Sequence, residues 1–155
     1  MTDISITEAK PSDLPMVLEL YLELHPDDPR VDSSIATESW ARILATPNRV
    51  VLLAWHGAHA IGSLEYTICA NLTRNARPYV LIENVVVAES FRRRGLASRM
   101  IKEVRERTTC LNAYKIQLAV DRAGPVGFYE ACGFKATGLV MKLDLSKESL
   151  CNEAD

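Results

Sequence analysis

The sequence lacks the long hydrophobic runs and the one-sided charge that would indicate a membrane or a nucleic acid as partner. No stretch of it approaches the roughly 20 consecutive apolar residues that a membrane span needs. Its 155 residues include 18 lysines and arginines against 20 aspartates and glutamates, a formal net charge of -2. Because a general nucleic-acid binder needs a basic surface, we expect neither a nucleic acid nor a membrane as partner.

Cysteine and histidine are too few and too dispersed to predict a metal centre. The cysteines, Cys69, Cys110, Cys132 and Cys151, form no CxxC pair, and the three histidines do not gather near them. We therefore expect reduced thiols and no metal. The first residues have neither the basic nor the apolar region of a secretion signal, so we expect a cytoplasmic protein.

The composition is that of an ordinary globular protein, with 48% hydrophobic and 25% charged residues. The length fits a single core, and no repeat or linker divides the chain. We expect one domain over residues 1–145, followed by a C-terminal tail over 146–155.

The hydrophobic pattern predicts an α/β protein of element order β-α-α-β-β-β-α-β-α-β. A helix separates the strands expected over 79–88 and 114–120, so we expect these two strands to be parallel. The strand over 79–88 is almost continuously apolar and is expected to be buried on both faces. The expected strands lie around residues 4–6 and over 49–55, 61–70, 79–88, 114–120 and 135–145, and the helices lie over 12–24, 34–44, 96–109 and 124–133.

One segment has the composition of a phosphate-binding loop. From Phe91 to Met100 the chain reads FRRRGLASRM, directly after an apolar strand and directly before an amphipathic helix. The free N–H groups and the positive end of the dipole at a helix start can bind phosphate oxygens. Gly95 lets the backbone approach a ligand closely. This segment therefore predicts a pyrophosphate site.

Three motifs follow one another in the second half of the chain. They are IENVVV at 82–87, Arg92-x-x-Gly95-x-Ala97, and FYEACGF at 128–134. In this order, with a strand before and a helix after the arginine motif, they resemble the GNAT-type N-acetyltransferases. The resemblance extends over about residues 4–145, and its specific part is 81–134.

The resemblance implies a mixed sheet of about six to seven strands with four helices, in which the fourth and fifth strands are parallel but splay apart. Acetyl-CoA, the co-substrate, would lie in that gap. Main-chain groups of Val85 and Val87 would pair with the pantetheine amides like an added strand, and the Arg92 and Arg94 guanidiniums would contact phosphate. The residues expected to bind acetyl-CoA are Val85, Val86, Val87, Arg92, Arg93, Arg94, Gly95, Leu96, Ala97, Ser98, Arg122 and Phe128.

Two positions depart from the family pattern. Where many members carry asparagine seven residues before the tyrosine of the last motif and alanine four before it, this chain has Arg122 and Pro125. Arg122 is either a phosphate contact or a solvated surface arginine.

Tyr129 resembles the family's general acid, a phenol that protonates the CoA thiolate as it leaves. The alternative is that Tyr129 and Phe128 are core aromatics of a short helix. Glu83 is the candidate base, because a carboxylate in an apolar strand is costly unless it is paired, hydrated or used. It would act directly or through ordered water, or it is simply hydrogen-bonded. Glu65 and Asp121 are weaker alternatives.

The acceptor amine is expected beside the first two helices and the segment between the third and fourth strands. The residues expected to contact it are Tyr21, Glu23, His25, Arg74 and Arg77. Acidic groups suit a cationic amine, whereas the arginines suit a phosphorylated acceptor. Residues 114–116 and 128–134 are similar to glucosamine-6-phosphate acetyltransferases, which favours an amino sugar phosphate. A peptide amine as acceptor, a non-catalytic acyl-CoA-binding module and a homodimer remain open.

Overall fold

The computed structural model describes residues 4–121 and 124–145, which fall in two compact units. The first unit ends at Leu118 and the second begins at Ala119. The tail expected over 146–155 lies outside the described residues, so the division into a domain and a tail stays a prediction.

The first unit contains five strands and four α-helices in the described part of the chain. The strands are β1 (Ile4–Glu8), β2 (Arg49–His56), β3 (His59–Cys69), β4 (Tyr79–Val87) and β5 (Ile116–Gln117), and the α-helices are α1 (Leu14–Leu24), α2 (Ser33–Ala45), α3 (Thr73–Ala76) and α4 (Leu96–Thr109). Short 3-10 turns, η1 (Pro11–Asp13) and η2 (Glu89–Phe91), precede α1 and the arginine-rich segment. The helix predicted over 96–109 is confirmed at both ends.

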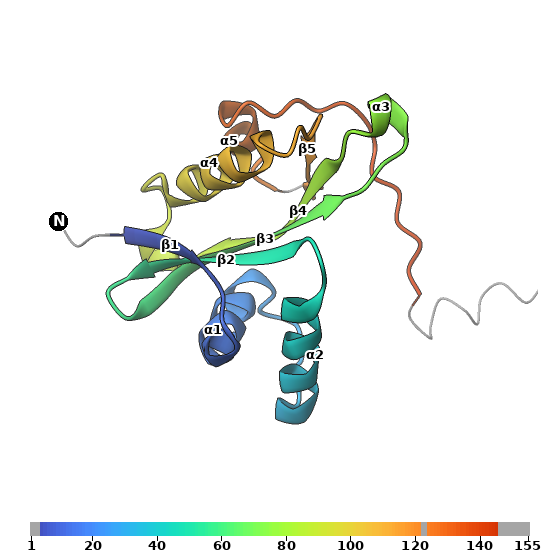
Figure 1. Cartoon of the computed structure of the whole chain (residues 1–155). Helices are drawn as coiled ribbons and strands as arrows, with labels where there is room; N and C mark the ends of the chain where they lie inside the picture. The colour runs from blue at the N-terminus through green and yellow to red at the C-terminus, as the bar shows by residue number, and fades with distance from the viewer. Residues whose placement is uncertain (1–3, 122–123, 146–155) are drawn as a thin grey trace, which may run out of the picture. The chain divides into compact units, whose positions relative to one another are not determined.

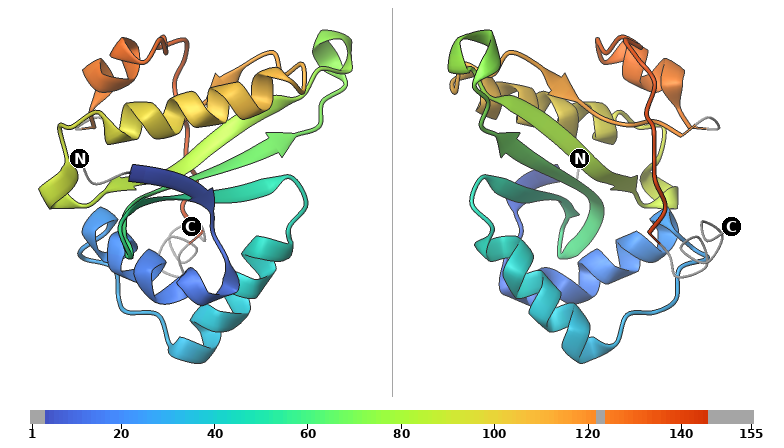
Figure 2. Two further views of the ribbon diagram at one scale, coloured as in Figure 1. Left: turned by 60° about the vertical axis from the view of Figure 1, so that its left-hand side comes forward. Right: turned by 90° about the vertical axis from the view of Figure 1, so that its right-hand side faces the viewer.

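The sheet has the strand order β1-β2-β3-β4-β5. All neighbours are antiparallel except β4 and β5, whose parallel pairing confirms the expectation for these two strands. Helices α1 and α2 cover one face of the sheet and α4 covers the other (Figure 1), and the two further views agree (Figure 2). The first unit is therefore a sheet between two helical layers.

The core on the α1 and α2 side is apolar and continuous. Val17 and Leu20 of α1 pack with Trp40 of α2, and the sheet contributes residues from β2 and β4 to the same cluster. The cluster comprises the buried residues Val17, Leu20, Trp40, Val51, Leu53 and Val86. Burial of each such side chain contributes roughly 1.5–3 kcal/mol to folding, which holds α1 against the sheet.

Helix α4 packs closely on the other face, at Gly62 of β3. A Cβ at Gly62 would lie 3.2 Å from the Val86 carbonyl oxygen and 3.3 Å from the Met100 sulfur. A larger residue would therefore require the Met100 side chain to shift by a few tenths of an ångström. The close approach at Gly62 lets the side chains of α4 pack directly on the sheet.

A bulge interrupts β4 at Asn84. In the register with β3, Glu83 is opposite Glu65 but Val86 is opposite Ser63, and Asn84 has a φ of 49°. Glu83 and Asn84 are exposed, whereas Ile82 and Val86 are buried. The expectation that this strand is buried on both faces is therefore wrong at residues 83–84, because the extra residue of the bulge bends the strand locally.

The end of the described chain corrects the predicted strand count. The short helix expected there is confirmed as α5 (Val126–Ala131), and the strand expected over 114–120 is reduced to Ile116–Gln117. The strand expected over 135–145 is wrong, since no strand is present there. Its apolar side chains are exposed, Leu139 by 96% and Met141 by 93%. Alternation alone does not make a strand, which also needs a hydrogen-bonded neighbour.

Candidate active site

The arginine-rich segment forms a tight turn that ends at the first residue of α4. Arg93 and Gly95 both have positive φ, 58° and 76°, and Gly95 is the N-cap of the helix. The carbonyl of Gly95 accepts a hydrogen bond from the Arg99 N–H at 3.0 Å, so the helix begins at once. The first-turn amides of α4 have no intrahelical acceptor, and the exposed Arg93 and Arg94 lie beside them. This geometry suits a phosphate group.

Arg92 is held in place by two neighbouring elements. Its Nε donates to the Val87 carbonyl oxygen at 2.9 Å, and its Nη2 donates to the Glu23 carboxylate at 3.2 Å. The same Glu23 oxygen accepts the N–H of Glu89 at 2.9 Å. Arg92 therefore links the end of β4 to α1, and only its remaining N–H groups can contact a ligand.

In the described chain, the edge of β4 that faces β5 has no strand partner along its second half. In the described chain β5 pairs with β4 only through Val80 and Leu81. The Ala88 N–H donates to the Ile61 carbonyl, so the main-chain groups of residues 86 and 88 face β3 and those of Val87 face the open edge. An extended ligand with amide groups can add to such an edge.

Glu65 is the buried carboxylate of the opposite face of the sheet. It is 2% exposed, and its Oε1 accepts a hydrogen bond from Arg49 Nε at 2.7 Å and forms an ion pair with Arg49 Nη2 at 2.6 Å. Its register partner on β2, Val51, belongs to the core under α1 and α2, so Glu65 points to that layer. The pair neutralises a charge that would be costly to bury alone.

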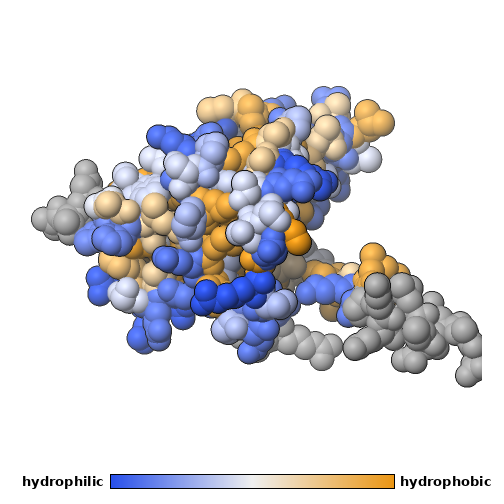
Figure 3. Space-filling view, turned by 90° about the horizontal axis from the view of Figure 1, so that it is seen from below, coloured by the Kyte–Doolittle hydropathy of each residue, from blue (hydrophilic) through white to orange (hydrophobic). Residues whose placement is uncertain are grey.

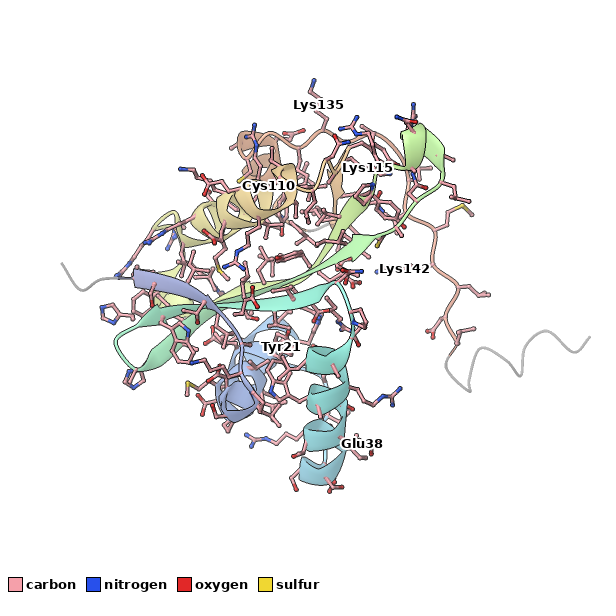
Figure 4. The ribbon with its side chains drawn as sticks, viewed as in Figure 1. Tyr21, Glu38, Cys110, Lys115, Lys135 and Lys142 are labelled. Atoms are coloured by element: carbon pink, nitrogen blue, oxygen red, sulfur yellow. The ribbon has the colours of Figure 1, made fainter. Side chains whose placement is uncertain are left out.

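Tyr21 of α1 lies against this ion pair, between the helix and the sheet (Figure 4). Burial, followed by the negative charge of Glu65, raises the pKa of Tyr21 to about 12, although Ser63, Arg49 and Asn84 act in the other direction. Ser63 and Asn84 are thus close to the phenol, but neither has the geometry of a hydrogen bond to it. Within the described residues the Tyr21 and Ser63 hydroxyls are buried without a hydrogen-bond partner.

Glu83 and Glu65 share a face of the sheet because they are directly paired in register. Glu83 is nevertheless exposed. The sequence pointed to Glu83 because burying a carboxylate costs free energy. In the structure that cost applies to Glu65 and not to Glu83. Glu83 is hydrated and open to a ligand on the side of α1.

The structure does not bring all the predicted acceptor residues together. Arg77 donates to the carbonyls of Asn112 and Ala113, at 3.0 and 3.3 Å, and Arg74 lies over the Tyr114 ring. Both arginines precede Tyr79, the first residue of β4. Tyr79 and Glu83 are roughly 13 Å apart along the strand, since each residue adds about 3.3 Å. His25 ends α1, its N–H donating to the Tyr21 carbonyl, and its side chain is exposed.

The sequence reasoning missed Arg49, Ser63 and Asn84. Arg49 and Ser63 become visible only from the hairpin register, which pairs Val51 with Glu65. Asn84 carried a weak signal, since asparagine tolerates a positive φ better than most residues.

The face of α1 and α2 also has an apolar hollow. Figure 3, seen from below, shows hydrophobic side chains in the middle of this face with hydrophilic ones around them. The hollow is lined by Pro11, Leu14, Thr37, Trp40, Ala41, Leu44 and Ala45. Thr37 is the single polar residue of that lining, so the hollow offers no group for acid–base chemistry.

The second unit contains the aromatic motif. The Phe128 and Tyr129 rings are 5.0 Å apart, and the Tyr129 and Phe134 rings are 5.9 Å apart at a steep angle. Burial, and then the neighbouring Cys132, raise the pKa of Tyr129, so the phenol keeps its proton at neutral pH. Asp121 is exposed and pairs with Lys142 at 3.4 Å. Arg122 lies outside the described residues.

The described residues form neither a candidate metal centre nor a membrane-spanning helix. No cluster of three or more histidine, cysteine, aspartate or glutamate side chains suited to a metal ion occurs among them. None of their helices has the length and apolar character needed to cross a membrane.

Comparisons with known proteins agree with these features. Residues 14–134 match the model of the acetyltransferase (GNAT) family. A glucosamine 6-phosphate N-acetyltransferase of Trypanosoma brucei brucei is 30% identical over 146 residues, 94% of this chain and 98% of the relative. Among solved structures, a "Putative acetyltransferase" from Agrobacterium tumefaciens strain C58 is 36% identical with a TM-score of 0.86, covering 90% of this chain and 99% of the other.

A crystal structure of a Trypanosoma brucei acetyltransferase is 30% identical with a TM-score of 0.81 and covers 92% of this chain and 100% of the other. The family match alone extends over more than half of the sequence and includes all three motifs. The chain therefore belongs to the GNAT family and is an acetyltransferase.

Proposed function

We propose that this enzyme transfers an acetyl group from acetyl-CoA to the primary amine of a small molecule, by direct attack within a ternary complex. The observation that carries the proposal is the open edge of β4, which leads directly into the arginine-rich turn at the start of α4. The strand edge can bind the amides of the pantetheine arm, and the turn that follows it can bind the pyrophosphate. The two groups follow one another in the same order in one CoA molecule.

In the proposed complex, Val85 and Val87 pair with the pantetheine amides, and the amides of residues 93–98 hold the pyrophosphate. Arg94 and the N–H groups that remain on Arg92 add charge-assisted contacts. The Val87 carbonyl already accepts a hydrogen bond from Arg92, but its second lone pair remains for a ligand. Phe128 packs against the pantetheine arm, and Arg122 is a further candidate for a phosphate contact.

The proposed chemistry is one nucleophilic substitution at the thioester. The neutral amine nitrogen attacks the acetyl carbon, a C–N bond forms, and the C–S bond breaks. Tyr129 gives its proton to the departing thiolate, a role that the raised pKa of Tyr129 supports because the proton is present at neutral pH. Before the attack, Glu83 takes one proton from the acceptor ammonium, directly or through ordered water. The second proton, which the nitrogen loses once the C–N bond has formed, passes through solvent to the Tyr129 phenolate and restores the phenol.

Glu83 suits the base better than Glu65 for a geometric reason. Glu65 is buried, and one of its oxygens already accepts a hydrogen bond from Arg49 Nε and forms an ion pair with Nη2. Glu83 is exposed on the same face of the sheet and can reach an incoming amine. Because Arg49 neutralises Glu65, the Glu83 carboxylate supplies the negative charge on that face that attracts an ammonium group.

We propose an amino sugar phosphate as the acceptor. The similarity to the trypanosomal glucosamine 6-phosphate N-acetyltransferase supports this choice. The exposed Glu83 carboxylate suits the ammonium group of such a molecule. Arg74, which is exposed, is a candidate for its phosphate, whereas Arg77 is already bonded to two carbonyls.

The test is an acceptor screen with acetyl-CoA and a reagent that detects free thiol. The acceptors are glucosamine 6-phosphate, unphosphorylated glucosamine, polyamines, amino acids, aminoglycosides and a lysine peptide. We expect glucosamine 6-phosphate to give the highest kcat/KM. A peptide as best acceptor would overturn the substrate, and CoA binding without thiol release for any amine would instead identify a non-catalytic acyl-CoA-binding module.

We also propose that two copies of the chain associate. The support is the second unit's segment over 135–145, where Leu139, Met141 and Leu143 alternate and are 96%, 93% and 80% exposed. Alternating, exposed apolar residues on a segment that forms no strand in the described chain suit the addition of a strand from another chain. Sedimentation of the wild type should give a dimer, and a Met141→Lys variant should shift it to monomer. A wild type that sediments as a monomer would contradict this.

A further inference from the structure

Two side chains of α1 meet the stretch of β4 proposed to bind pantetheine, one at each end of it. Tyr21 lies beside Asn84, the residue of the bulge, just before Val85. Glu23, two residues further along the helix, accepts the N–H of Glu89 just after Val87. Helix α1 therefore contacts the chain on both sides of residues 85–87.

The contact at the far end is a chain of hydrogen bonds. The Glu23 carboxylate accepts Arg92 Nη2 at 3.2 Å, and Arg92 Nε donates to the Val87 carbonyl at 2.9 Å. The Glu89 N–H, which begins η2, is bonded to the same carboxylate oxygen. Glu23 thereby fixes both the turn that leaves β4 and the arginine that orients its last carbonyl.

The contact of Tyr21 before Val85 supports the backbone of the bulge at Asn84, which has a positive φ. A positive φ costs a typical non-glycine residue roughly 1–2 kcal/mol and asparagine less, so contacts with neighbours help to hold Asn84 in place. The Tyr21 phenol lies beside the side chains of Asn84 and Ser63, which belong to the two strands that the bulge joins. Val86, which follows the bulge, packs in the same core as α1.

We infer that α1 is the element that positions the acetyl-CoA edge of β4, and that Glu23 is a positioning residue acting through Arg92 and Glu89. This inference rests on the proposed function. It changes the role predicted for Glu23, which the sequence places among the acceptor contacts. It also has a consequence for binding: an acceptor that shifts α1 shifts the acetyl-CoA edge, so each ligand alters the affinity for the other by the same factor.

The test compares Glu23→Ala with Glu19→Ala, one helical turn earlier on α1. Glu19 is exposed and makes no hydrogen bond or ion pair within the described chain, so this control reproduces the change in charge and helix propensity. The first readout is amide hydrogen exchange over residues 84–92 of the free protein. It includes the bonded amides of Ala88, Phe91 and Arg92. We expect exchange to be about fivefold faster in Glu23→Ala and unchanged in Glu19→Ala.

The second readout is steady-state kinetics with acetyl-CoA and the best acceptor. We expect Glu23→Ala to raise the KM for acetyl-CoA about fivefold and to leave the KM for the acceptor within about twofold, in line with the loss of one hydrogen-bond network. Unchanged exchange with a raised acceptor KM would overturn the inference and restore Glu23 as an acceptor contact. Tighter acetyl-CoA binding would also overturn it, since Glu23 would then act only as a counter-charge to Arg92.

The exchange measurement needs no ligand, so it separates the two proposals. A wild type that shows no heat with CoA in calorimetry contradicts the proposed function alone. A wild type that binds CoA, with both variants exchanging at its rate, contradicts the positioning role alone.

Discussion

Glu65 of β3 and Glu83 of β4 are directly opposite each other, yet only one of them is buried. The Glu65 carboxylate is 2% exposed and paired with Arg49, whereas Glu83 is open to solvent beside the bulge at Asn84. Cross-strand partners share a face and are about 5 Å apart at Cβ. Arg49 therefore neutralises the buried carboxylate, whereas Glu83 is accessible for the proton transfer proposed above.

Replacing Glu83 by glutamine tests its role as base. We expect kcat/KM to fall about a hundredfold at neutral pH, within the range of a lost general base. The rate should partly recover at alkaline pH, because the acceptor amine then loses its proton to solvent. Glu38→Gln, on the exposed surface of α2, is the matched control. An unchanged rate and an unchanged alkaline rise in Glu83→Gln would remove Glu83 from the mechanism.

Replacing Arg49 by alanine tests the structural role of the ion pair. The Glu65 charge would stay buried without its partner, so we expect a loss of about 3–5 kcal/mol in the free energy of unfolding. The double variant Arg49→Met with Glu65→Leu should lose much less, since it leaves no buried charge. Urea unfolding measures both. A loss of less than about 1 kcal/mol for Arg49→Ala would show that Glu65 does not need this partner.

The raised pKa of Tyr21 predicts that the free energy of unfolding depends on pH in the alkaline range. The pKa of Tyr21 rises from 10.0 to about 12 in the folded state, so the native protein holds this proton more tightly than the unfolded chain does. The contribution of Tyr21 to the free energy of unfolding is therefore constant below pH 10 and falls by up to about 2–3 kcal/mol between pH 10 and 12. Comparison with Tyr21→Phe isolates this contribution, since the variant should lose less stability across that range. Parallel curves for the two proteins would contradict the raised pKa.

Substitutions of Asn84 test whether its positive φ is needed for the bulge in β4. Alanine at this position should lower the free energy of unfolding by roughly 1 kcal/mol, because its backbone resists the φ of 49°. Glycine adopts this φ without strain, so Asn84→Gly should be closer to the wild type in stability. Thermal unfolding of the two variants gives the comparison. Equal stability of alanine and glycine would mean that the strand relaxes the bulge.

The parts of the fold that were predictable from the sequence are those set by local pattern. Residues 96–109 alternate buried and solvated positions with a helical period, and α4 has the predicted ends. Residues 135–145 alternate equally well for a strand but join no sheet in the described chain, so the strand predicted from this pattern was wrong. A helix closes its own hydrogen bonds, whereas a strand depends on a neighbour that the local sequence does not name.

The candidate site was predictable only in part for the same reason. The arginine-rich turn is contiguous, and its motif led to the family that the comparisons confirm. The Arg49–Glu65 pair depends on the register of β2 against β3, and the exposure of Glu83 depends on one extra residue in β4. Such long-range geometry is not encoded in the spacing of residues along one strand.

The most direct test of the account is a calorimetric titration of the wild type and of Gly95→Val with acetyl-CoA. Valine resists the φ of 76° at the helix start and would crowd the proposed pyrophosphate site. The account predicts one acetyl-CoA per chain for the wild type and binding at least about tenfold weaker for a variant that still unfolds cooperatively. A wild type that produces no heat, or a folded variant that binds as tightly as the wild type, would contradict it.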